Sequence, residues 1–184
     1  PYENKIAKEK LDNQNLKSIS ESLIFSNSGE GIMIKKDITK GILLRGYFAK
    51  DFSKLDIVNN GNFLGSENKL SNNSISISKE LSFSLNLEIG DEITLMSSSG
   101  VQTIIGNIPK QKKFTVVSLF DSGVIDFDNN VAFINLVTLE EFFNLKQKNR
   151  NLEIYLKNPK NIEYQKTIVQ KIFNDEFIYT WSDM

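Results

Sequence analysis

Hydrophobic residues recur along most of the chain with the two-residue period of β-strands, and shorter stretches between them have the spacing of helices. The two periods are interspersed rather than separated into halves. We therefore predict an α+β fold. The expected strands are residues 19–25, 31–35, 41–47, 75–77, 93–96, 114–120, 131–136, 152–156 and 177–179. The expected helices are residues 2–16, 51–55, 78–90, 138–145 and 162–173.

Short polar residues mark several of the expected boundaries. Asp51, Ser78 and Thr138 each stand before a helical stretch, where a side-chain oxygen can cap the free backbone N–H groups. The residues 27–29, Asn-Ser-Gly, predict a turn between the first two strands. Residues 59–73 are rich in Asn, Gly and Ser, which is typical of a loop, and we place a boundary between two lobes there.

The composition excludes several classes of chemistry. The chain has no cysteine and no histidine, so disulfides, thiol catalysis, Ser-His-Asp triads and His-ligated zinc are impossible. Its formal net charge of -1 gives no general attraction to nucleic acid. No apolar run approaches the roughly 18 residues of a membrane span. The chain begins with proline rather than methionine, from which we expect a fragment of a larger protein.

An unusual apolar segment lies between two of the expected strands, at residues 97–108. It is too long for a two-residue hairpin turn, and it carries Val101, Ile104, Ile105 and Ile108 where ordinary loops are polar. One interpretation is a projecting arm whose tip binds a partner. The other is that the arm folds back and these side chains complete the core.

A short basic stretch follows, running from Pro109 to Lys113. It has no interleaved aromatic residues, so it is a poor candidate for binding nucleic acid. The simplest interpretation is the solvated start of a strand. The functional one is that Gln111 and Lys112 add polar contacts at the base of the arm.

The acidic segment at residues 121–130 could be taken for a calcium loop, because Asp126 and Asp128 have alternating spacing. The sixth and twelfth positions from Asp126 are Val131 and Val137, whereas an EF-hand loop needs Gly and Glu there. We therefore expect a structural turn. A glycosidase with paired carboxylates is a weaker alternative, and no ATP-binding glycine loop occurs. The sequence assigns no catalytic residue, no cofactor and no metal ligand.

Two groups of residues resemble a known family of permeases. Residues 78–95 resemble the strand, short helix, Gly-Asp turn and strand shared by macrolide-exporter-type and lipoprotein-releasing transporters, with Asn86 in place of a family glycine. The run from Gly106 to Val117, together with residues 120–123 and 126–128, resembles the lipoprotein-releasing permeases of the LolC/LolE family. Supporting matches lie at residues 43–46 and 180–183.

The resemblance implies a two-lobed MacB/LolC-type periplasmic domain of a bacterial inner-membrane ABC transporter. Residues 1–60 and 136–184 would form a porter-like lobe with a split βαβ arrangement, and residues 61–135 an inserted Sabre-like lobe. Residues 97–108 would be a β-hairpin "hook" that engages the lipoprotein carrier LolA, with a polar "pad" beside it. The implied partner-binding residues are Val101, Ile104, Ile105, Ile108, Pro109, Gln111 and Lys112.

The resemblance also implies further partners: a second permease subunit, either LolE-like or a second copy, the ATPase subunit LolD, and the lipoprotein substrate. The domain itself would not be an enzyme. Two positions depart from LolC, since Thr94 stands where the pad has an arginine and Ile104-Ile105 stand where the tip has Pro-Met. The alternative is the periplasmic domain of a MacB-type efflux permease that couples to an adaptor protein.

Overall fold

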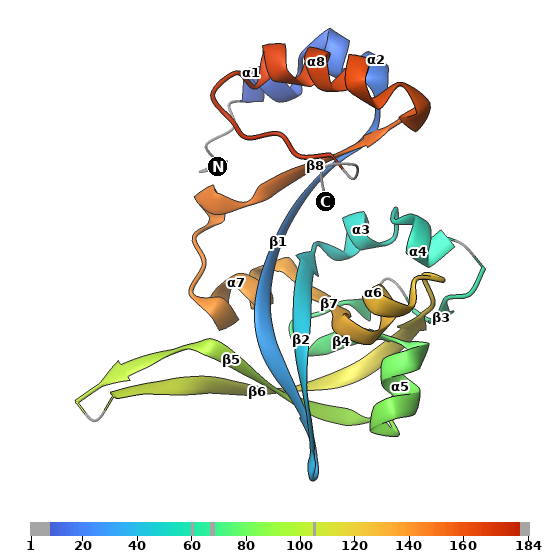
Figure 1. Ribbon diagram of the computed structural model, residues 1–184. Coiled ribbons are helices and arrows are strands. Elements are labelled where there is room, and N and C mark those ends of the chain that lie inside the picture. The colour runs from blue at the N-terminus through green and yellow to red at the C-terminus, as the bar shows by residue number, and fades with distance from the viewer. Residues whose placement is uncertain (1–7, 60, 67–68, 105, 181–184) are drawn as a thin grey trace. The chain divides into compact units, whose positions relative to one another are not determined.

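The computed structural model describes residues 8–59, 61–66, 69–104 and 106–180 (Figure 1). The chain divides into two compact units: residues 1–24 with 147–184 (unit 1), and residues 25–146 (unit 2). Helices and strands are mixed along the chain, which confirms the α+β class. Among the described residues, no helix is long and apolar enough to cross a membrane.

Unit 2 is built on a sheet whose strand pairings form a closed circuit. Each strand pairs with the next in the order β1, β2, β7, β4, β6, β5, and β5 pairs again with β1. The β2–β7 and β4–β6 pairs are parallel and the others are antiparallel. A short strand, β3 (Leu64–Gly65), adds to β6. The six strands are β1 (Ser20–Lys35), β2 (Ile38–Tyr47), β4 (Ser74–Ser78), β5 (Glu92–Thr103), β6 (Gly106–Phe120) and β7 (Val131–Asn135).

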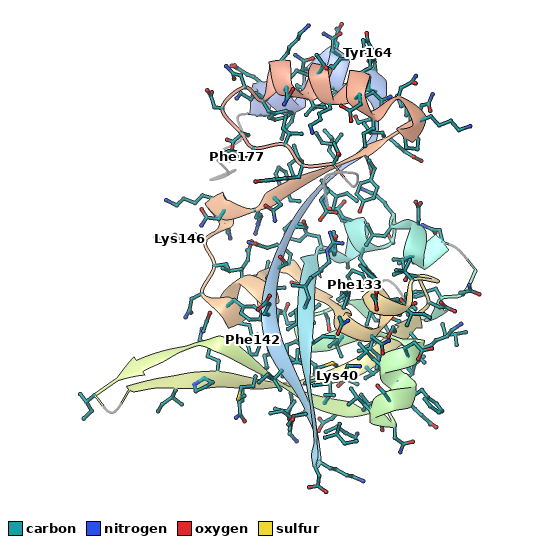
Figure 2. All side chains as sticks on the ribbon, viewed as in Figure 1. Lys40, Phe133, Phe142, Lys146, Tyr164 and Phe177 are labelled. Carbon is teal, nitrogen blue, oxygen red and sulfur yellow. The ribbon has the colours of Figure 1, made fainter. Side chains whose placement is uncertain are left out.

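All six strands contribute residues to one hydrophobic core. Two helices, α5 (Lys79–Leu85) and α7 (Leu136–Phe143), pack against the same core with side chains such as Leu81, Leu139 and Phe142. A second group of packed rings surrounds Phe133, which is labelled within unit 2 in Figure 2. The centres of the Phe133 and Phe120 rings are 5.0 Å apart. Three short helices complete the unit: α3 (Ala49–Phe52), α4 (Asp56–Asn59) and α6 (Ile125–Asn130).

The two longer helices of unit 2 have well-defined ends. The Ser78 hydroxyl caps α5 by accepting from the backbone of Leu81, and the Asn135 side chain caps α7 by accepting from Val137 and Thr138. At the other end, Asn86 and Asn144 take the left-handed conformation, with φ of 48° and 56°. Asparagine tolerates this conformation better than most residues, so it can stop a helix where glycine is absent.

Unit 1 has a small core of its own, centred on Leu16, Val169 and Phe173. Partly buried apolar side chains from the same unit pack around them. Tyr164 points away from this core on the outer side of α8 (Figure 2). The elements of unit 1 are α1 (Lys8–Leu11), α2 (Gln14–Ile19), the start of β1, η2 (Gln147–Asn149), β8 (Asn151–Leu156), η3 (Pro159–Asn161) and α8 (Ile162–Ile172).

Several expected boundaries are wrong. The turn predicted at residues 27–29 does not form, because these residues pair with β2 and β1 continues through them. Residues 177–179 are irregular rather than a strand. Thr138 lies inside α7, since Asn135 supplies the cap. Asp51 lies inside α3 and binds Lys54 at 2.7 Å instead of capping a helix.

Only residues 8–16 of the helix expected at residues 2–16 are described, and there the helix is interrupted. The structure has α1 and α2 there, with Asn13 capping α2 through its side-chain oxygen, and residues 1–7 lie outside the described part. The two compact units also divide the chain at other residues than the expected lobes, because β2 pairs with β7 and keeps residues 38–47 in unit 2. The assignment of family lobes to 1–60 with 136–184 and to 61–135 stays a prediction.

Candidate functional site

The β5–β6 hairpin extends beyond the other strands of unit 2 (Figure 1). β1 pairs with β5 only as far as Ser97, and β4 pairs with β6 only from Thr115 onward. Between these points and the turn, β5 and β6 pair with each other alone. The segment predicted as the hook, residues 97–108, is therefore the outer part of a two-stranded ribbon.

Apolar side chains are exposed near the turn of this ribbon. Ile104 is fully exposed and Ile108 is half exposed, so these two residues do not complete the core. Val101 pairs with Ile108 across the hairpin. Gly106, the first residue of β6, has φ of 122°, a conformation that favours glycine. Ile105 lies outside the described residues.

A bulge interrupts the ladder at the base of the ribbon. Met96 pairs with Gln111 and Gly100 pairs with Pro109, so three residues of β5 face the single residue Lys110 of β6. The Ser97 hydroxyl is buried and donates to the Ser99 carbonyl oxygen at 2.5 Å. Bulges bend a strand and increase its local twist, so this one helps to set the direction of the ribbon.

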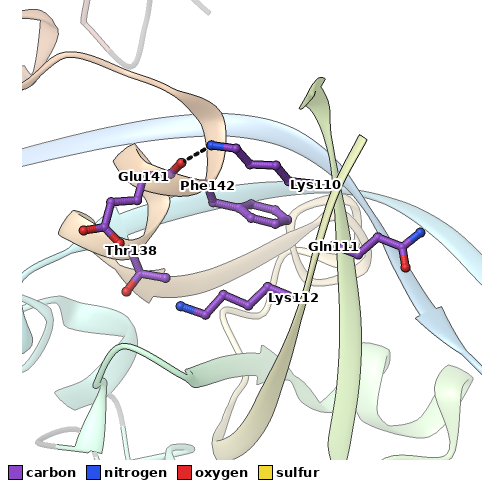
Figure 3. Close-up of a pocket in the computed structure, with 6 residues that line it drawn as sticks. All are labelled: Lys110, Gln111, Lys112, Thr138, Glu141 and Phe142. Atoms are coloured by element: carbon purple, nitrogen blue, oxygen red, sulfur yellow. Dashed lines mark hydrogen bonds between the residues drawn. The ribbon is translucent and has the colours of Figure 1, made fainter. Parts of the chain in front are cut away.

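The basic stretch of β6 lies beside α7, and the two enclose a shallow pocket of about 260 Å³. Figure 3 shows Lys110 and Lys112 extending toward α7, while Gln111 extends to the other side of the strand. Gln111 contacts the Met96 sulfur at 3.6 Å, and the Lys112 ammonium lies 5.5 Å from the centre of the Phe114 ring. The pocket is lined by Lys110, Gln111, Lys112, Thr138, Glu141 and Phe142.

Lys110 is a residue that the sequence interpretation passed over. Its ammonium donates to the carbonyl oxygen of Glu141 at 2.7 Å and to Oδ1 of Asn144 at 2.5 Å. The strand alternation offered a signal, because residues 110 and 112 share one face of β6 while residue 111 lies on the other. No pattern in the sequence indicates that α7 lies opposite that face.

The acidic segment forms α6 where a turn was expected. The carboxylate of Asp128 accepts from the backbone N–H of Ser122 at 3.1 and 3.2 Å, and Asp121 forms an ion pair with Lys79 at 3.8 Å. Ser78 also donates to the Asp128 carbonyl oxygen. Among the described residues, no group of three or more acidic, His or Cys side chains could hold a metal ion.

The comparisons with known sequences point to one kind of membrane protein. No protein-family model matches the chain. Over 81 residues the chain is 31% identical to the lipoprotein-releasing system transmembrane protein LolC of Neisseria meningitidis, a stretch that covers 44% of this chain and 20% of that protein. A LolC of Xylella fastidiosa is 30% identical over 71 residues, or 39% of this chain and 17% of that protein.

A longer match is with an uncharacterized membrane protein of Buchnera aphidicola, which is 28% identical over 170 residues. This match covers 88% of the chain and 39% of that relative. The chain thus spans less than half the length of each of these relatives.

Solved structures share the fold at low sequence identity. The periplasmic region of MacB from Actinobacillus actinomycetemcomitans aligns with a TM-score of 0.57 and 13% identity, over 91% of this chain and 71% of that one. The extracellular domain of the transporter YknZ from Gram-positive bacteria aligns with a TM-score of 0.54 and 14% identity, over 91% of this chain and 82% of that one.

Proposed function

We propose that the chain is a periplasmic domain of the LolC/MacB type and that it serves a lipoprotein-releasing ABC permease by holding the soluble lipoprotein carrier LolA. The domain brings the carrier to the transporter, and lipoproteins pass from the inner membrane to the carrier there. The matches to LolC favour this role over others open to the fold.

The projecting hairpin is the observation that carries this proposal. Within the described part of the chain no third strand pairs with the outer ribbon, and Ile104 and Ile108 present aliphatic surface to solvent. A carrier of acylated proteins must have an apolar cavity for the acyl chains, and an aliphatic hook is complementary to such a cavity. We assign Val101, Ile104, Ile105 and Ile108 to the hook, and Pro109, Gln111 and Lys112 to the polar pad at its base.

The size of the hook limits the free energy that it can contribute to carrier binding. Three or four aliphatic side chains bury on the order of 300 Å², which contributes roughly 7 kcal/mol at about 25 cal/mol per Å² before the entropy of association is subtracted. The pad adds orientation more than free energy, because polar contacts at the rim of an interface are partly solvated. A micromolar dissociation constant corresponds to a binding free energy of about -8 kcal/mol, which the hook alone does not reach, so binding of that strength requires buried surface beyond the hook.

In this proposal the domain performs no covalent chemistry. ATP is hydrolysed by a separate subunit of the LolD kind, and a second permease subunit, LolE-like or a second copy, completes the transporter. The domain needs no cofactor. It supplies the docking surface and passes on movement that reaches it from the membrane.

The second candidate function is that of an efflux permease domain that couples to an adaptor protein. It is favoured by the shared fold with the periplasmic region of MacB. Such a role does not require an aliphatic tip on the β5–β6 ribbon. Removing the ribbon would then leave adaptor binding mostly intact.

Isothermal titration of the domain with LolA tests the proposal. The matched variant replaces residues 97–110 with Asn-Gly, since Met96 and Gln111 face each other across the ladder and a two-residue turn can join them. We expect saturable binding by the parent chain and none by the shortened one. Absent binding, or binding that the shortened chain retains, would favour the efflux-type role.

A further inference from the structure

We propose that Lys110 is a positioning residue of the hook: its ammonium ties the base of the β5–β6 ribbon to the C-terminal end of α7 and so fixes the direction of the tip. The effect on carrier binding rests on the proposed function. The mechanical part concerns unit 2 alone.

The ribbon needs such a tie because the sheet stops supporting it early. β5 loses its second neighbour after Ser97, and β6 has one only from Thr115 onward. Two-stranded ribbons vary widely in twist and are marginally stable by themselves. The direction of the tip must therefore be fixed by side-chain contacts near the base.

Lys110 lies at the position where such a contact has most effect. It is the residue of β6 that faces the bulge of β5, at the point where the ladder is irregular and bends most easily. It lies four positions along β6 from Gly106 at the turn, which is about 14 Å at 3.4 Å per residue. A bend of about 20° at the bulge would move the tip by about 5 Å.

The contact itself joins a full charge to two oxygens. The ammonium donates to the carbonyl oxygen of Glu141 and to the side-chain oxygen of Asn144, at 2.7 and 2.5 Å (Figure 3 shows the first). The Glu141 carbonyl belongs to the last turn of α7, where backbone carbonyls carry the negative end of the helix dipole. Charge-assisted hydrogen bonds of this kind are stronger than neutral ones.

The α7 side of the contact is held firmly. Asn135 caps the start of the helix, and Thr138 donates from its hydroxyl to the Asn72 carbonyl oxygen at 3.1 Å. Leu139 and Phe142 are buried in the core of unit 2. Asn144 is fixed in the left-handed conformation that ends the helix, which sets the direction of its side chain.

Neighbouring lysines make different contacts. The Lys112 ammonium lies near the Phe114 ring, on its own strand. Lys113 pairs with Glu92 at 3.1 Å, across the hairpin. Both of these contacts stay within the β5–β6 pair, so neither can hold the pair against α7. Lys113 therefore offers a matched control for the loss of a charge.

The mechanical part is tested with two spin labels on the 184-residue chain, whose native sequence has no cysteine. One label replaces Ile104 at the tip and the other replaces the exposed Phe83 on α5, within the same unit. We expect Lys110→Met to broaden the distance distribution between the labels, and Lys113→Met to leave it unchanged. Equal distributions for Lys110→Met and the parent would overturn the proposal.

A second variant removes the partner of Lys110 at the end of α7 instead of Lys110 itself. Asn144→Gly keeps the left-handed helix end but removes the acceptor oxygen, so it should broaden the distribution in the same direction. Melting temperatures of all variants, read by circular dichroism, show whether unit 2 stays folded. If Lys110→Met fails to fold, Asn144→Gly decides the outcome by itself.

The functional part is tested by titrating the unlabelled variants with LolA. We expect Lys110→Met to raise the dissociation constant by about fivefold, since a loosened element must be ordered on binding, and Lys113→Met to leave it within twofold. A broadened ribbon with unchanged affinity would overturn the role in carrier binding. If the parent chain does not bind LolA, the proposed function fails, and the label distances still decide whether Lys110 holds the ribbon.

Discussion

Ile104 is the side chain whose position most directly connects the fold to the proposed role. It is fully exposed at the turn of the β5–β6 ribbon, so it contributes no buried surface to the folded chain. We expect Ile104→Asp to leave the melting temperature unchanged, because no packing is lost, and to weaken LolA binding by at least tenfold, because a carboxylate must be desolvated in an apolar cavity. Titration and thermal denaturation of the same sample measure both.

The control for this substitution is Ile125→Asp. Ile125 is 72% exposed at the start of α6, where an acidic residue is favourable, and it lies outside the hook. Its replacement should affect neither stability nor carrier binding. If Ile125→Asp weakened binding as much as Ile104→Asp, the hook would not be the docking element.

Gly29 shows how a single residue keeps β1 against α7. A Cβ added there would lie 2.6 Å from a ring carbon of the buried Phe143. We expect Gly29→Ala to lower the free energy of unfolding by about 1–3 kcal/mol through overpacking, as measured by urea denaturation. Gly41→Ala on β2 is the control, because a Cβ there meets no atom within 4 Å. Equal effects of the two substitutions would argue against the close contact.

At the scale of elements, α5 ends at Asn86, the position where the resembled family has a glycine. Asn86 takes φ of 48°, and the Leu87 N–H then bonds the Ser82 carbonyl at 2.9 Å. We expect Asn86→Gly to keep or raise the melting temperature, and Asn86→Val to cost about 1–2 kcal/mol, since a β-branched residue is strained there. Thermal unfolding of both variants measures this. A stable Asn86→Val variant would contradict the left-handed helix end.

Elements with regular spacing were predictable and one of the three expected caps formed, whereas features decided by distant partners were not predictable. The strand 75–77, the cap at Ser78 and the helix beginning at residue 162 depend on neighbouring residues, and the structure has them. Residues 27–29 have turn chemistry, yet pairing with β2 extends β1 through them. Local propensity is a weak prior where a strand partner satisfies the backbone.

The candidate site divides in the same way. The place of Ile104 and Ile108 between two strands left open whether they are exposed on an arm or complete the core, and the structure has both exposed. Lys110 contacts Glu141 and Asn144, which lie 31 and 34 positions further along the sequence. No local sequence pattern could predict a contact over that separation. The bulge facing Lys110 was also missed, because only the pairing of two strands defines one.

At the scale of the whole molecule, the two compact units have cores of very different size. Unit 2 has a core to which six strands and two helices contribute, whereas the core of unit 1 is centred on Leu16, Val169 and Phe173. Stability is distributed unevenly when cores differ in this way. The smaller unit should therefore open at a lower free energy than the larger one, and hydrogen exchange can resolve the two.

We expect Leu16→Ala to destabilise unit 1 without destabilising unit 2. Leu16 is fully buried, so its truncation should cost about 2–5 kcal/mol, and the loss should fall on unit 1. Backbone amides of α2 and α8 should then exchange faster, while those of β5 and β6 keep their protection and the hook still binds LolA. Leu95→Ala in the core of unit 2 should do the reverse, accelerating exchange in β5 and β6 first. If Leu16→Ala released the amides of both units together, the chain would unfold as one cooperative body, and the hook would depend on the core of unit 1 as much as on its own.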